Sequence, residues 1–545
     1  MICILHGYLL EGSGSNLWTS AMARALCRIG HPVHLVCQEA HPDAFDFIAA
    51  AHVYEPDGSV TTLFERETPY AGDCVMHKPR LGDTLPVYVA DRYEEYSNVV
   101  PMVELSDQAI AAYLSRNVAT VEGVVRNYGI TSIHANHAVL MSVVAERLSA
   151  TTGVPFAIMP HGSAIEYVVK KDHRFHVLAA AAFDRAARIF VQGPEMHRRV
   201  IETFPDLVGL ENKLMSLNLG VDAQAFKPIQ RKDRTENVSK LINALKGRQR
   251  GMPGDAFQEL GRRLHADIAH EELSAILAEA QIDRSKLPDA GVEERLASVD
   301  WAHDDVLLFV GRLMSAKGLQ SIIAALPQIF ASRPGARLVV VGDGPIRPVM
   351  QAFLWALEHG EKQLAMHIVD RGSELEGGGA APYDEMSAYF GELKSRGKLD
   401  GYFETARQVV RPDRVIFTGY LRHGELKYLM PCCDVAIFPS KVAEAGPLVL
   451  LEAAASGCFP LGTYFAGMAA HIDSIARSLP LADAALMRLS NDASRTVADI
   501  IANTEAALAL EGVHKTALRR CVEEHYDWVQ AADKFAAELA ALNST

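Results

Sequence analysis

The chain has 545 residues, of which 49% are hydrophobic, 22% charged and 7% aromatic, a composition typical of ordinary soluble proteins. This length exceeds what one hydrophobic core usually organises, so we expect two domains with insertions. The formal net charge of -14 argues against a nucleic-acid partner, because nothing in the chain as a whole compensates the repulsion of phosphate.

The cysteines and the first ten residues indicate the cellular compartment in which the protein is expected. The eight cysteines show no Cys-x-x-Cys spacing and no paired framework, which favours a reducing compartment, and we expect a cytoplasmic protein. The first ten residues lack a basic start and a small-residue cleavage site, and Glu11 interrupts them. They are therefore expected to form a buried strand rather than a signal peptide. No stretch approaches 18 uncharged apolar residues, so no membrane span is predicted.

Short apolar runs alternate with helical patterns through the first 220 residues. Fully apolar strands that alternate with helices predict a parallel sheet covered on both faces. The expected strands of this half are Ile2–His6, Val33–Cys37, Thr131–Ala135, Phe156–Met159 and Ile189–Val191.

The loop Glu11-Gly-Ser-Gly-Ser-Asn16 follows the first expected strand and precedes a helix expected to start near Leu17. Gly14 would let the backbone come close to a phosphate or an acceptor. Alone, such a loop fits any nucleotide-binding domain of this type. A dinucleotide-binding fingerprint needs a third glycine and an acidic residue at the end of the second strand, so that alternative is weaker.

The segment Met159-Pro-His-Gly-Ser-Ala-Ile-Glu-Tyr167 places His161 just beyond another apolar strand. Its ring is expected to project from the carboxyl end of that strand toward a ligand, although a histidine of the core or of a turn also fits the pattern. Glu166 and Tyr167 could reach a sugar or an acceptor, but helix capping by Ser163 and Glu166 explains them equally well.

Residues 231–300 and 347–412 fit neither half of the chain. Both exceed the usual length of connections and are expected to fold as helical additions. The first opens with the basic segments Arg231–Arg234 and Lys246–Arg250. These additions could select an acceptor, and the basic piece could touch a membrane surface, or it could be a solvated decoration of the fold.

A second series of apolar strands follows, expected at Val306–Val310, Leu338–Val341, Val415–Phe417, Val435–Phe438 and Phe459–Leu461. The first of them ends at Gly311, and Arg312 and Lys317 follow in the loop before a helix expected near Leu319. Two cations at the carboxyl edge of a parallel sheet lie where open α/β folds bind ligands. Arginine offers a fork for phosphate oxygens and lysine a mobile point charge. The loops that contain Gly342 and Tyr420 follow other strands of this series.

A helix start is expected directly after the strand at Val435–Phe438. Pro447 suits the first helical turn, where its missing N–H goes unused, and Gly446 would then be the cap. The N–H groups of Leu448 and Val449 would have no partner within the helix. Together with the helix dipole, such free donors attract phosphate.

Two glutamates, Glu444 and Glu452, stand on either side of this helix start. Glu444 is expected in the loop above the helix end, and Glu452 roughly 7 Å lower at 1.5 Å rise per residue. Carboxylates that accept hydroxyl hydrogen bonds on both sides of a phosphate site suit a nucleotide-sugar, with the sugar at one end and the ribose at the other. Further along, residues 525–542 are predicted to be helical from the spacing of Trp528, Ala532, Phe535 and Leu539.

These motifs resemble those of retaining glycosyltransferases of the GT-B type, family 4 (glycosyl transferases group 1). The segment Glu444–Glu452 resembles the family's Glu-x7-Glu motif, Gly311–Gly318 its Gly-Arg-Leu…Lys-Gly motif, and Asn218–Asp222 the segment that joins its two domains. The resemblance implies an α/β fold of two doubly wound Rossmann-like domains that face a cleft, with helical insertions. The expected parts are an N-terminal acceptor domain (1–220), a linker and helical insertion (221–300), a C-terminal nucleotide-sugar domain (301–515) with an insertion at about 347–412, and a C-terminal helix (516–545) that crosses back to the first domain.

The resemblance also implies roles for residues. Arg312 and Lys317 would neutralise the leaving nucleoside diphosphate, Glu444 would contact the donor sugar, and His161 would lie near the sugar's C6 hydroxyl; these four are the expected catalytic residues. The expected donor-binding residues are Gly14, Gly311, Gly342, Tyr420, Gly446, Leu448, Val449 and Glu452. No Asp-x-Asp pair follows a strand at either edge of the cleft, so no metal and no cofactor are expected.

The implied reaction moves a hexose from a nucleotide-diphosphate sugar, with UDP as the expected nucleotide, to an acceptor hydroxyl with retention of configuration. The leaving phosphate would take the acceptor proton on the same face. The acceptor could be a small molecule, a glycan or a lipid, and a peripheral membrane contact is compatible with the basic piece. Two alternatives stay open: a GT-B nucleotide-sugar epimerase and a catalytically silent GT-B scaffold. The presence of all four charged residues of the two motifs, Arg312, Lys317, Glu444 and Glu452, counts against the scaffold.

Overall fold

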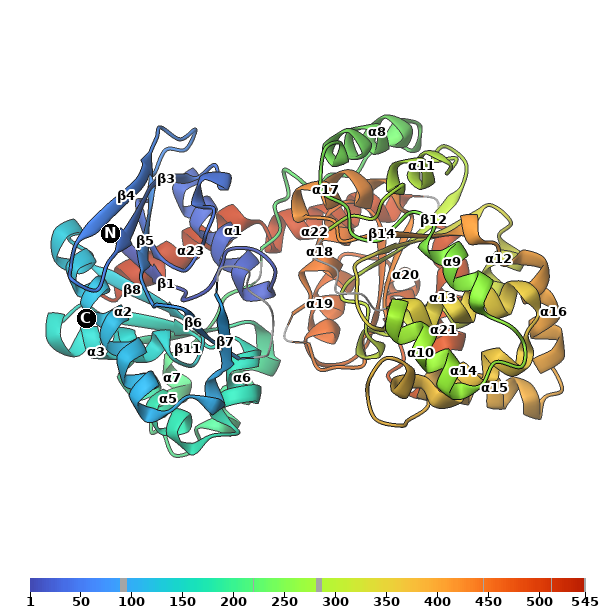
Figure 1. Cartoon of the computed structure of the whole chain (residues 1–545). Coiled ribbons are helices and arrows are strands. Elements are labelled where there is room, and N and C mark those ends of the chain that lie inside the picture. Colours follow the sequence, from blue (N-terminus) through green and yellow to red (C-terminus); the bar gives the residue numbers. More distant parts are fainter. Residues whose placement is uncertain (89–95, 219, 281–286, 445, 511, 544–545) are drawn as a thin grey trace. The chain divides into compact units, whose positions relative to one another are not determined.

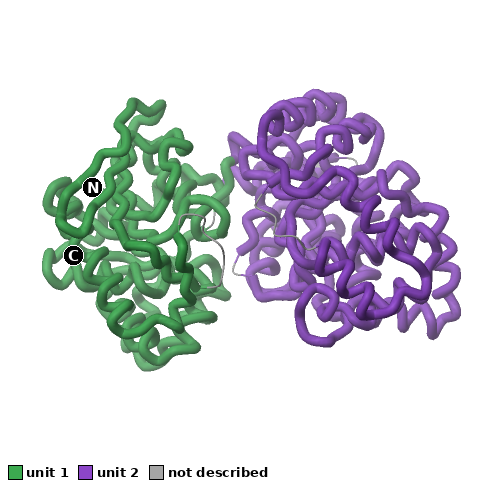
Figure 2. The backbone as a smooth tube through the Cα atoms, viewed as in Figure 1, with its two compact units in different colours: residues 1–222, 525–545 green, residues 223–524 purple. Residues whose placement is uncertain are grey.

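The computed structural model describes residues 1–88, 96–218, 220–280, 287–444, 446–510 and 512–543 (Figure 1). The chain divides into two compact units (Figure 2). Unit 1 comprises residues 1–222 and 525–545, and unit 2 comprises residues 223–524. Each unit is built around its own largely parallel sheet.

In unit 1, the described residues form a nine-stranded sheet in the order β11-β10-β9-β8-β1-β2-β5-β3-β4. Neighbouring strands run parallel except β3 and β4, which are antiparallel. The strands of the sheet are β1 (Ile2–Leu5), β2 (Val33–Val36), β3 (Ile48–Tyr54), β4 (Val60–Glu65), β5 (Cys74–Pro79), β8 (Ser132–Asn136), β9 (Phe156–Met159), β10 (Arg188–Val191) and β11 (Leu214–Ser216), and a separate parallel pair is β6 (Thr84–Val87) with β7 (Asn98–Pro101).

All five strands predicted for this half are confirmed, as β1, β2, β8, β9 and β10. The part of the sheet formed by β3, β4 and β5 was not predicted. Strand β4 is an antiparallel edge whose side chains are mostly exposed, so it lacks the continuous apolar run by which the buried parallel strands were identified.

The helices of unit 1 are α1 (Gly14–Arg28), α2 (Asp107–Tyr128), α3 (Met141–Thr152), α4 (Gly162–Ala164), α5 (His173–Arg185), α6 (Gly193–Thr203), α7 (Leu210–Lys213) and α23 (Trp528–Ala541). Helix α23 comes from the far end of the chain and packs on α1 and β8, where Figure 1 shows it in red among the blue and cyan elements. Its buried residues include the whole predicted stripe, Trp528, Ala532, Phe535 and Leu539. The ring of Trp18 on α1 meets Phe535 at 6.0 Å and Trp528 at 6.5 Å between centroids.

The chain leaves unit 1 and returns to it at neighbouring points. Val221 and Asp527 form a parallel bridge, and the Val221 N–H donates to the Tyr526 carbonyl at 2.6 Å. A Cβ at Gly220 would lie 2.2 Å from the Trp528 ring, so only glycine fits there. The outgoing and returning segments of unit 1 are therefore packed against each other.

In unit 2, the described residues form a six-stranded, all-parallel sheet in the order β14-β13-β12-β15-β16-β17. Its strands are β12 (Asp305–Val310), β13 (Ala336–Val341), β14 (Val415–Gly419), β15 (Val435–Phe438), β16 (Phe459–Thr463) and β17 (Arg488–Leu489). The five strands predicted for this half are confirmed as β12 to β16.

The helices of unit 2 are α8 (Arg234–Leu245), α9 (Ala256–Arg263), α10 (His270–Ala280), α11 (Val292–Ala297), α12 (Leu319–Ser332), α13 (Ile346–His359), α14 (Lys362–Leu375), α15 (Asp384–Ser395), α16 (Leu399–Val409), α17 (His423–Leu429), α18 (Leu448–Ala455), α19 (Ala466–Ala476), α20 (Leu481–Leu486), α21 (Ala493–Leu508) and α22 (Val513–His525). The two predicted additions are helical where they are described: α8 to α11 belong to the first, and α14 to α16, with most of α13, to the second.

The arginines of the basic piece are engaged inside unit 2. Arg234 is 1% exposed, and its Nη1 donates to Asp434 Oδ2 at 3.0 Å. Arg248 pairs with Glu425, and Arg250 pairs with Glu293. The positive charge of this segment therefore fastens α8 and the loop after it to the rest of unit 2.

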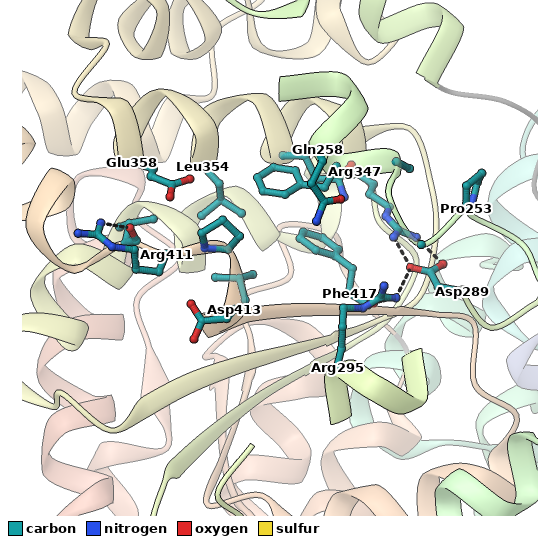
Figure 3. Close-up of a pocket in the computed structure, with 17 residues that line it drawn as sticks. Pro253, Gln258, Asp289, Arg295, Arg347, Leu354, Glu358, Arg411, Asp413 and Phe417 are labelled. Atoms are coloured by element: carbon teal, nitrogen blue, oxygen red, sulfur yellow. Dashed lines mark hydrogen bonds and ion pairs between the residues drawn. The ribbon is translucent and has the colours of Figure 1, made fainter. Parts of the chain in front are cut away.

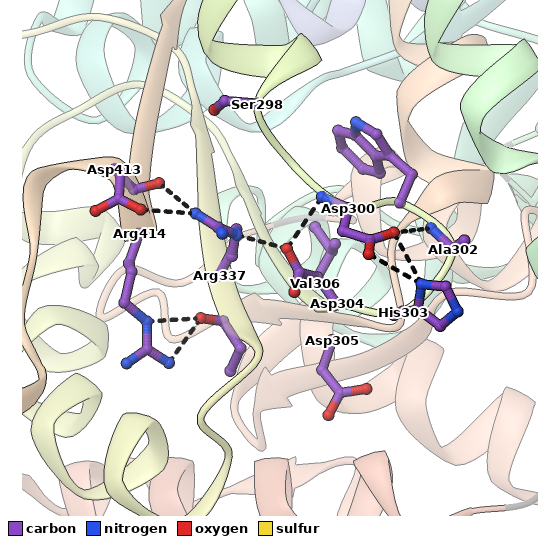
Figure 4. A network of polar contacts seen from close by, with 12 residues as sticks. Ser298, Asp300, Ala302, His303, Asp304, Asp305, Val306, Arg337, Asp413 and Arg414 are labelled. Atoms are coloured by element: carbon purple, nitrogen blue, oxygen red, sulfur yellow. Dashed lines mark hydrogen bonds and ion pairs between the residues drawn. The ribbon is translucent and has the colours of Figure 1, made fainter.

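A network of ion pairs joins the amino ends of the first strands of the unit 2 sheet (Figure 4). Arg337 on β13 donates from Nε to Asp304 Oδ2 at 2.6 Å and from Nη1 to Asp413 Oδ2 at 3.1 Å. Asp305 pairs with Arg231 at 3.2 Å. The adjacent Asp304 and Asp305 are thus neutralised by arginines, at the edge of the sheet opposite to the loop that begins at Gly311.

Candidate functional site

The loops after β12, β13 and β14 converge at the carboxyl edge of the unit 2 sheet. The Gly311 N–H donates to the Val341 carbonyl at 3.0 Å, and the Gly342 N–H donates to the Gly419 carbonyl at 2.9 Å. Gly342 has a φ of +134°, and a Cβ there would lie 1.9 Å from the Gly311 carbonyl oxygen. Only glycine allows this close packing, so Gly311 and Gly342 shape the edge where parallel α/β sheets bind ligands.

Arg312 and Lys317 both lie in the loop between β12 and α12, as predicted, and α12 begins at Leu319. Arg312 is exposed and forms no ion pair within the described part of the chain. The end of the loop is held in place because the Lys441 N–H donates to the Ala316 carbonyl at 2.9 Å. Gly318 has a φ of +80°, and a Cβ there would lie 2.1 Å from the Pro439 carbonyl oxygen.

This anchoring brings Lys317 to Glu444. The Lys317 Nζ lies 2.9 Å from Glu444 Oε1, and both side chains are partly exposed. The Glu444 carbonyl in turn accepts from the Gly467 N–H at 2.9 Å. The structure therefore pairs two residues to which the sequence assigned different partners, the phosphate and the sugar.

Helix α18 begins one residue later than predicted. Pro447 is the N-cap in extended conformation, with φ -76° and ψ 109°, and Leu448 is the first helical residue. The prediction that Gly446 caps the helix and Pro447 lies in its first turn is wrong, because the ψ of Pro447 is not helical. The N–H groups of Leu448 and Val449 still lie in the first turn, where no acceptor within the helix can reach them.

Glu452 is buried in α18, with 3% of its surface exposed. Its Oε1 lies 3.3 Å from Nε2 of His423, the first residue of α17. Burial raises the pKa of Glu452, and the nearby imidazole acts in the opposite direction. His423 was not identified from the sequence, since no local pattern connects it to a glutamate 29 positions further along.

Tyr420 was expected to meet a nucleotide base chiefly through its backbone. In the structure its N–H donates to the Leu287 carbonyl at 2.9 Å. That donor is not available to a base unless this bond breaks. The Leu287 carbonyl therefore competes with any base for the backbone donor of this loop.

In unit 1, the loop between β1 and α1 is shorter than expected. Helix α1 begins at Gly14 rather than near Leu17, because the Ser13 side chain caps it by accepting from the Asn16 N–H at 3.3 Å. Gly14 is thus a helical residue. No atom would lie within 4 Å of a Cβ there, so the backbone of this first turn is open to a ligand.

His161 follows β9 as expected, but its ring turns into unit 1 instead of projecting outward. It is buried, with a φ of +47°, and Nε2 lies 3.0 Å from Asn136 Oδ1. The ring packs 4.7 Å from that of His137. Burial lowers the pKa of His161 to about 3, so the imidazole is neutral near neutral pH.

His161 belongs to a buried group that we call the histidine cluster: His6, His134, His137 and His161, joined by Asn136 and Thr19. Asn136 contacts three of the histidines through hydrogen-bond distances of 3.0 to 3.5 Å. Burial also lowers the pKa of His6 to about 4 and that of His134 to about 3. The cluster was not identified from the sequence, because its members lie in or directly after three different strands, β1, β8 and β9.

Of the two roles considered for Glu166 and Tyr167, the structure tests only helix capping; contact with a sugar or an acceptor stays a prediction. Glu166 accepts from Lys170 at 2.7 Å and lies 3.5 Å from Arg199. No side-chain hydrogen bond caps α4, so the predicted capping by Ser163 and Glu166 is wrong. Tyr167 is 47% exposed and lies beside the ammonium group of Lys171.

Three general features concern the described residues only. No helix among them combines the length and the apolar character needed to cross a bilayer. No group of three or more histidine, cysteine, aspartate or glutamate side chains is placed to hold a metal ion. All eight cysteines are buried and unpaired.

Comparison with known proteins connects this site to sugar transfer. Residues 397–473 match the family described as "Glycosyl transferases group 1". Over 176 residues the chain is 27% identical to the glycogen synthase of Mycobacterium tuberculosis, a match that covers 32% of this chain and 28% of that relative. These two findings support a glycosyltransferase.

Solved structures match over nearly the whole chain. The sucrose-phosphate synthase of Thermosynechococcus elongatus is 16% identical, with a TM-score of 0.52 and coverage of 100% of this chain and 99% of the other. The Anabaena HepE in complex with UDP is 15% identical, with a TM-score of 0.52 and 99% coverage of both chains. The catalytic domain of starch synthase IV from Arabidopsis thaliana, bound to ADP and acarbose, is 12% identical, with a TM-score of 0.53 and coverage of 100% and 99%.

The fold is GT-B. Both units of this GT-B chain have the expected α/β architecture, and the helical additions belong to unit 2. Within that unit, the family match at residues 397–473 includes α17, Glu444 and the whole of α18. It therefore covers both glutamates and His423, while Arg312 and Lys317 lie outside the matched residues.

Proposed function

We propose that this protein is a retaining glycosyltransferase of family 4, which moves a hexose from a nucleotide-diphosphate sugar to an acceptor hydroxyl without a metal ion. The proposal rests on the grouping of Arg312, Lys317, Glu444 and the first turn of α18 within unit 2. Two cations and a helix N-terminus near one another suit a diphosphate, because charge-assisted hydrogen bonds and the helix dipole both favour it.

Each of the candidate site residues has its own role in the proposed reaction. Arg312 and Lys317 stabilise the negative charge that develops on the leaving diphosphate. Glu444 accepts hydrogen bonds from the donor sugar, and Glu452 accepts them from the ribose. The acceptor hydroxyl attacks from the face that the diphosphate leaves, and a phosphate oxygen takes its proton, so no protein base is required.

The neutral, buried state of His161 is consistent with a reaction that requires no protein base. Its ring is held by Asn136 and packs within the histidine cluster, which leaves it poorly placed as a base for attack from the opposite face. We assign its ring to the packing of unit 1, and its backbone carbonyl to the neighbourhood of the donor sugar.

UDP is the proposed nucleotide because structures of the similar HepE contain UDP and UDP-glucose. ADP is the second candidate, since the similar starch synthase IV contains ADP. The acceptor is an alcohol of unassigned class. Because its eight thiols are free and buried, we place the protein in a reducing compartment, the cytoplasm.

The test begins with binding of UDP, ADP and GDP by calorimetry, followed by incubation of the matching labelled sugar nucleotides with pools of alcohol acceptors. Mass spectrometry identifies a transfer product, and NMR of that product gives its anomeric configuration. We expect transfer in the presence of EDTA, with retention.

Loss of activity in EDTA that added metal restores would overturn the metal-free mechanism. An inverted product would overturn the family assignment. Sugar release or rearrangement without any transfer would favour the epimerase, and nucleotide binding without turnover would favour the scaffold.

A further inference from the structure

A cavity of about 280 Å³ lies in unit 2 between the two helical additions (Figure 3). Its walls come from the loop before α9 and from α9 itself, from α13, from residues 410–413 and from β14. None of the residues proposed to bind the donor lines it. This volume lies close to the lower limit of known small-molecule sites, which suits a compact ligand.

One end of the cavity is lined by two arginines and one aspartate. Arg347 donates from Nη1 to Asp289 Oδ1 at 3.0 Å, and Arg295 Nη2 donates to Asp289 Oδ2 at 3.3 Å. Two guanidinium groups thus share the carboxylate of Asp289. A second carboxylate, that of Asp343, pairs with Arg347 Nη1 at 3.7 Å, but Asp343 does not line the cavity.

This end of the cavity is also buried and incompletely bonded. Arg347 is 2% exposed, and its Nε has no hydrogen-bond partner within the described part of the chain. Burial lowers the pKa of Arg295, which reflects the cost of holding this second cation there. A carboxylate at this end would offer the Arg347 Nε an acceptor and would pair with the Arg295 guanidinium group.

The middle of the cavity is apolar and includes flat surfaces. Phe257, Leu354, Val415 and Phe417 line it, and the Arg347 guanidinium carbon lies 5.1 Å from the centre of the Phe417 ring. At the far end stand Glu358, Arg411 and Asp413, which Figure 3 shows apart from the Arg347–Asp289 pair. Burial raises the pKa of Glu358, so this end does not favour a second negative charge on the ligand.

We infer that the cavity is a binding site for a small aromatic carboxylate, with its carboxylate at Arg295 and Arg347 and its ring among the apolar side chains. An aromatic monoanion satisfies both features of the site, the buried and incompletely bonded guanidinium groups and the flat apolar walls. A sugar or a free phosphate would leave the apolar walls without contacts.

The site is placed to influence donor binding, a part of the inference that rests on the proposed function. Arg347 reaches Asp343, which lies between Gly342 and Gly344 in the loop after β13. Asp289 donates from its N–H to the Thr418 carbonyl at 2.9 Å, next to the loop of Tyr420. A carboxylate that draws on Arg347 and Arg295 therefore acts on residues that support two of the candidate donor loops.

The test uses 1-naphthoate as the probe and 1-naphthamide, its neutral counterpart, as the ligand control, both titrated by calorimetry into the full chain. We expect saturable binding of 1-naphthoate, at least about tenfold tighter than that of the amide, because the neutral amide cannot form the charge-assisted contact. Absence of saturable binding, or equal binding of the two compounds, would refute the site.

Two variants locate the binding. Leu354→Trp fills the cavity, and Arg295→Met removes the charge while keeping an apolar stem; each should weaken 1-naphthoate by about tenfold or more. Arg347 is left unchanged, because its loss would strand Asp289 in the interior. Arg407→Met, an exposed arginine on α16 outside the cavity, is the matched control and should bind normally. Normal binding by Arg295→Met would refute the placement of the carboxylate, even if Leu354→Trp failed to fold.

The coupling is measured as the dissociation constant of UDP with and without saturating 1-naphthoate. We expect a change of at least about threefold, which Arg295→Met should abolish. An unchanged UDP affinity would refute the coupling but leave the binding site standing. If the chain binds 1-naphthoate but no nucleotide at all, the proposed donor site fails and the aromatic carboxylate site does not.

Discussion

The ion pair between Lys317 and Glu444 joins two residues that the proposed reaction uses for different groups. Both side chains are partly exposed, so the pair itself contributes little to stability. A diphosphate would compete with Glu444 for the ammonium group, and Glu444 would then be released toward the sugar. Arg312, which has no ion pair within the described residues, is free to meet the diphosphate without such an exchange.

Replacement of either cation tests this arrangement. Arg312→Ala and Lys317→Ala should each lower kcat/KM by about a hundredfold or more, because each removes a charge-assisted contact that strengthens in the transition state. The melting temperature should change little, since neither side chain is buried. Arg396→Ala, an exposed arginine at the end of α15, is the control and should keep full activity. Rates close to those of the unchanged protein in both variants would exclude the assignment.

The two glutamates are expected to behave differently toward the free nucleotide. Glu452→Gln should weaken UDP by about 1.5–3 kcal/mol, the value of a hydrogen bond to a charged group, because its proposed partner is the ribose. Glu444→Gln should leave UDP affinity intact or raise it, since it frees Lys317, while transfer falls. Calorimetry with UDP on both variants decides the matter, and equal losses of affinity would mean that the proposed division of roles is wrong.

At the scale of elements, the sequence predicted what is local and apolar. All ten expected strands are present, because continuous apolar runs identify buried parallel strands from the sequence. Helix α12 begins at the expected residue, because the Lys317-Gly318 turn marks its start. The edge formed by β3, β4 and β5 was missed, since the side chains of β4 are mostly exposed and polar residues interrupt the apolar runs of β3 and β5. The N-cap of α1 was missed because Ser13 acts where the sequence suggested a longer glycine loop.

The candidate site was predictable only in part. Arg312, Lys317, Glu444 and Glu452 each belong to a short motif, and each lies in unit 2 at an expected place. His423 could not be found beforehand, because its contact with Glu452 depends on how the tertiary fold brings the first residue of α17 to the side chain of a residue on α18. The burial of His161 has the same kind of cause, since Asn136 on β8 holds its ring.

The histidine cluster makes the stability of unit 1 depend on pH. Its members have pKa values lowered to about 4 for His6 and about 3 for His134 and His161, below the ordinary value of about 6.5. Between about pH 6.5 and pH 4 the unfolded chain therefore binds more protons than the folded one. The stability is fully present above pH 6.5 and is lost as the pH falls toward 4, which a pH titration followed by circular dichroism should show.

His134→Phe is the variant that tests this origin. The Nδ1 of His134 is buried without a partner among the described residues, and Asn136 Oδ1, the partner of its Nε2, keeps its bond to His161, so phenylalanine should be tolerated at neutral pH, and it cannot take up a proton. We expect the acid midpoint to move to lower pH. His303→Gln, which replaces an exposed histidine, is the control and should leave the midpoint where it is. An unchanged midpoint in His134→Phe would assign the acid sensitivity to other groups.

At the scale of the whole molecule, unit 1 is assembled from two separate parts of the chain, and unit 2 from one. Residues 223–524 hold their own sheet, the candidate donor residues and both helical additions. We expect this segment to fold when expressed alone and to bind UDP, because Arg312, Lys317 and Glu452 all lie within it. An unfolded fragment would show that unit 2 depends on unit 1.

Residues 1–222 alone should not fold stably, since the Trp18 face of α1 would lack α23. A short glycine-serine linker from Asp222 to His525 should restore the fold, because Val221 and Asp527 already lie side by side. Thermal unfolding of the two fragments, with and without the added segment, measures the effect. Equal stability of both fragments would mean that α23 is dispensable.

Because unit 1 is built from two separate parts of the chain, the ribosome synthesises these parts at different times. Its first 222 residues emerge early, but the helix that covers Trp18 is encoded after about 300 further residues. At a synthesis rate of about 5–20 residues per second, the apolar face of α1 and β8 remains without α23 for about 15–60 s. Unit 2, although translated later, has all of its own chain first. Of the two units, the one whose chain is made first is therefore the last to be completed, and during that interval it exposes an apolar surface to which a chaperone can bind.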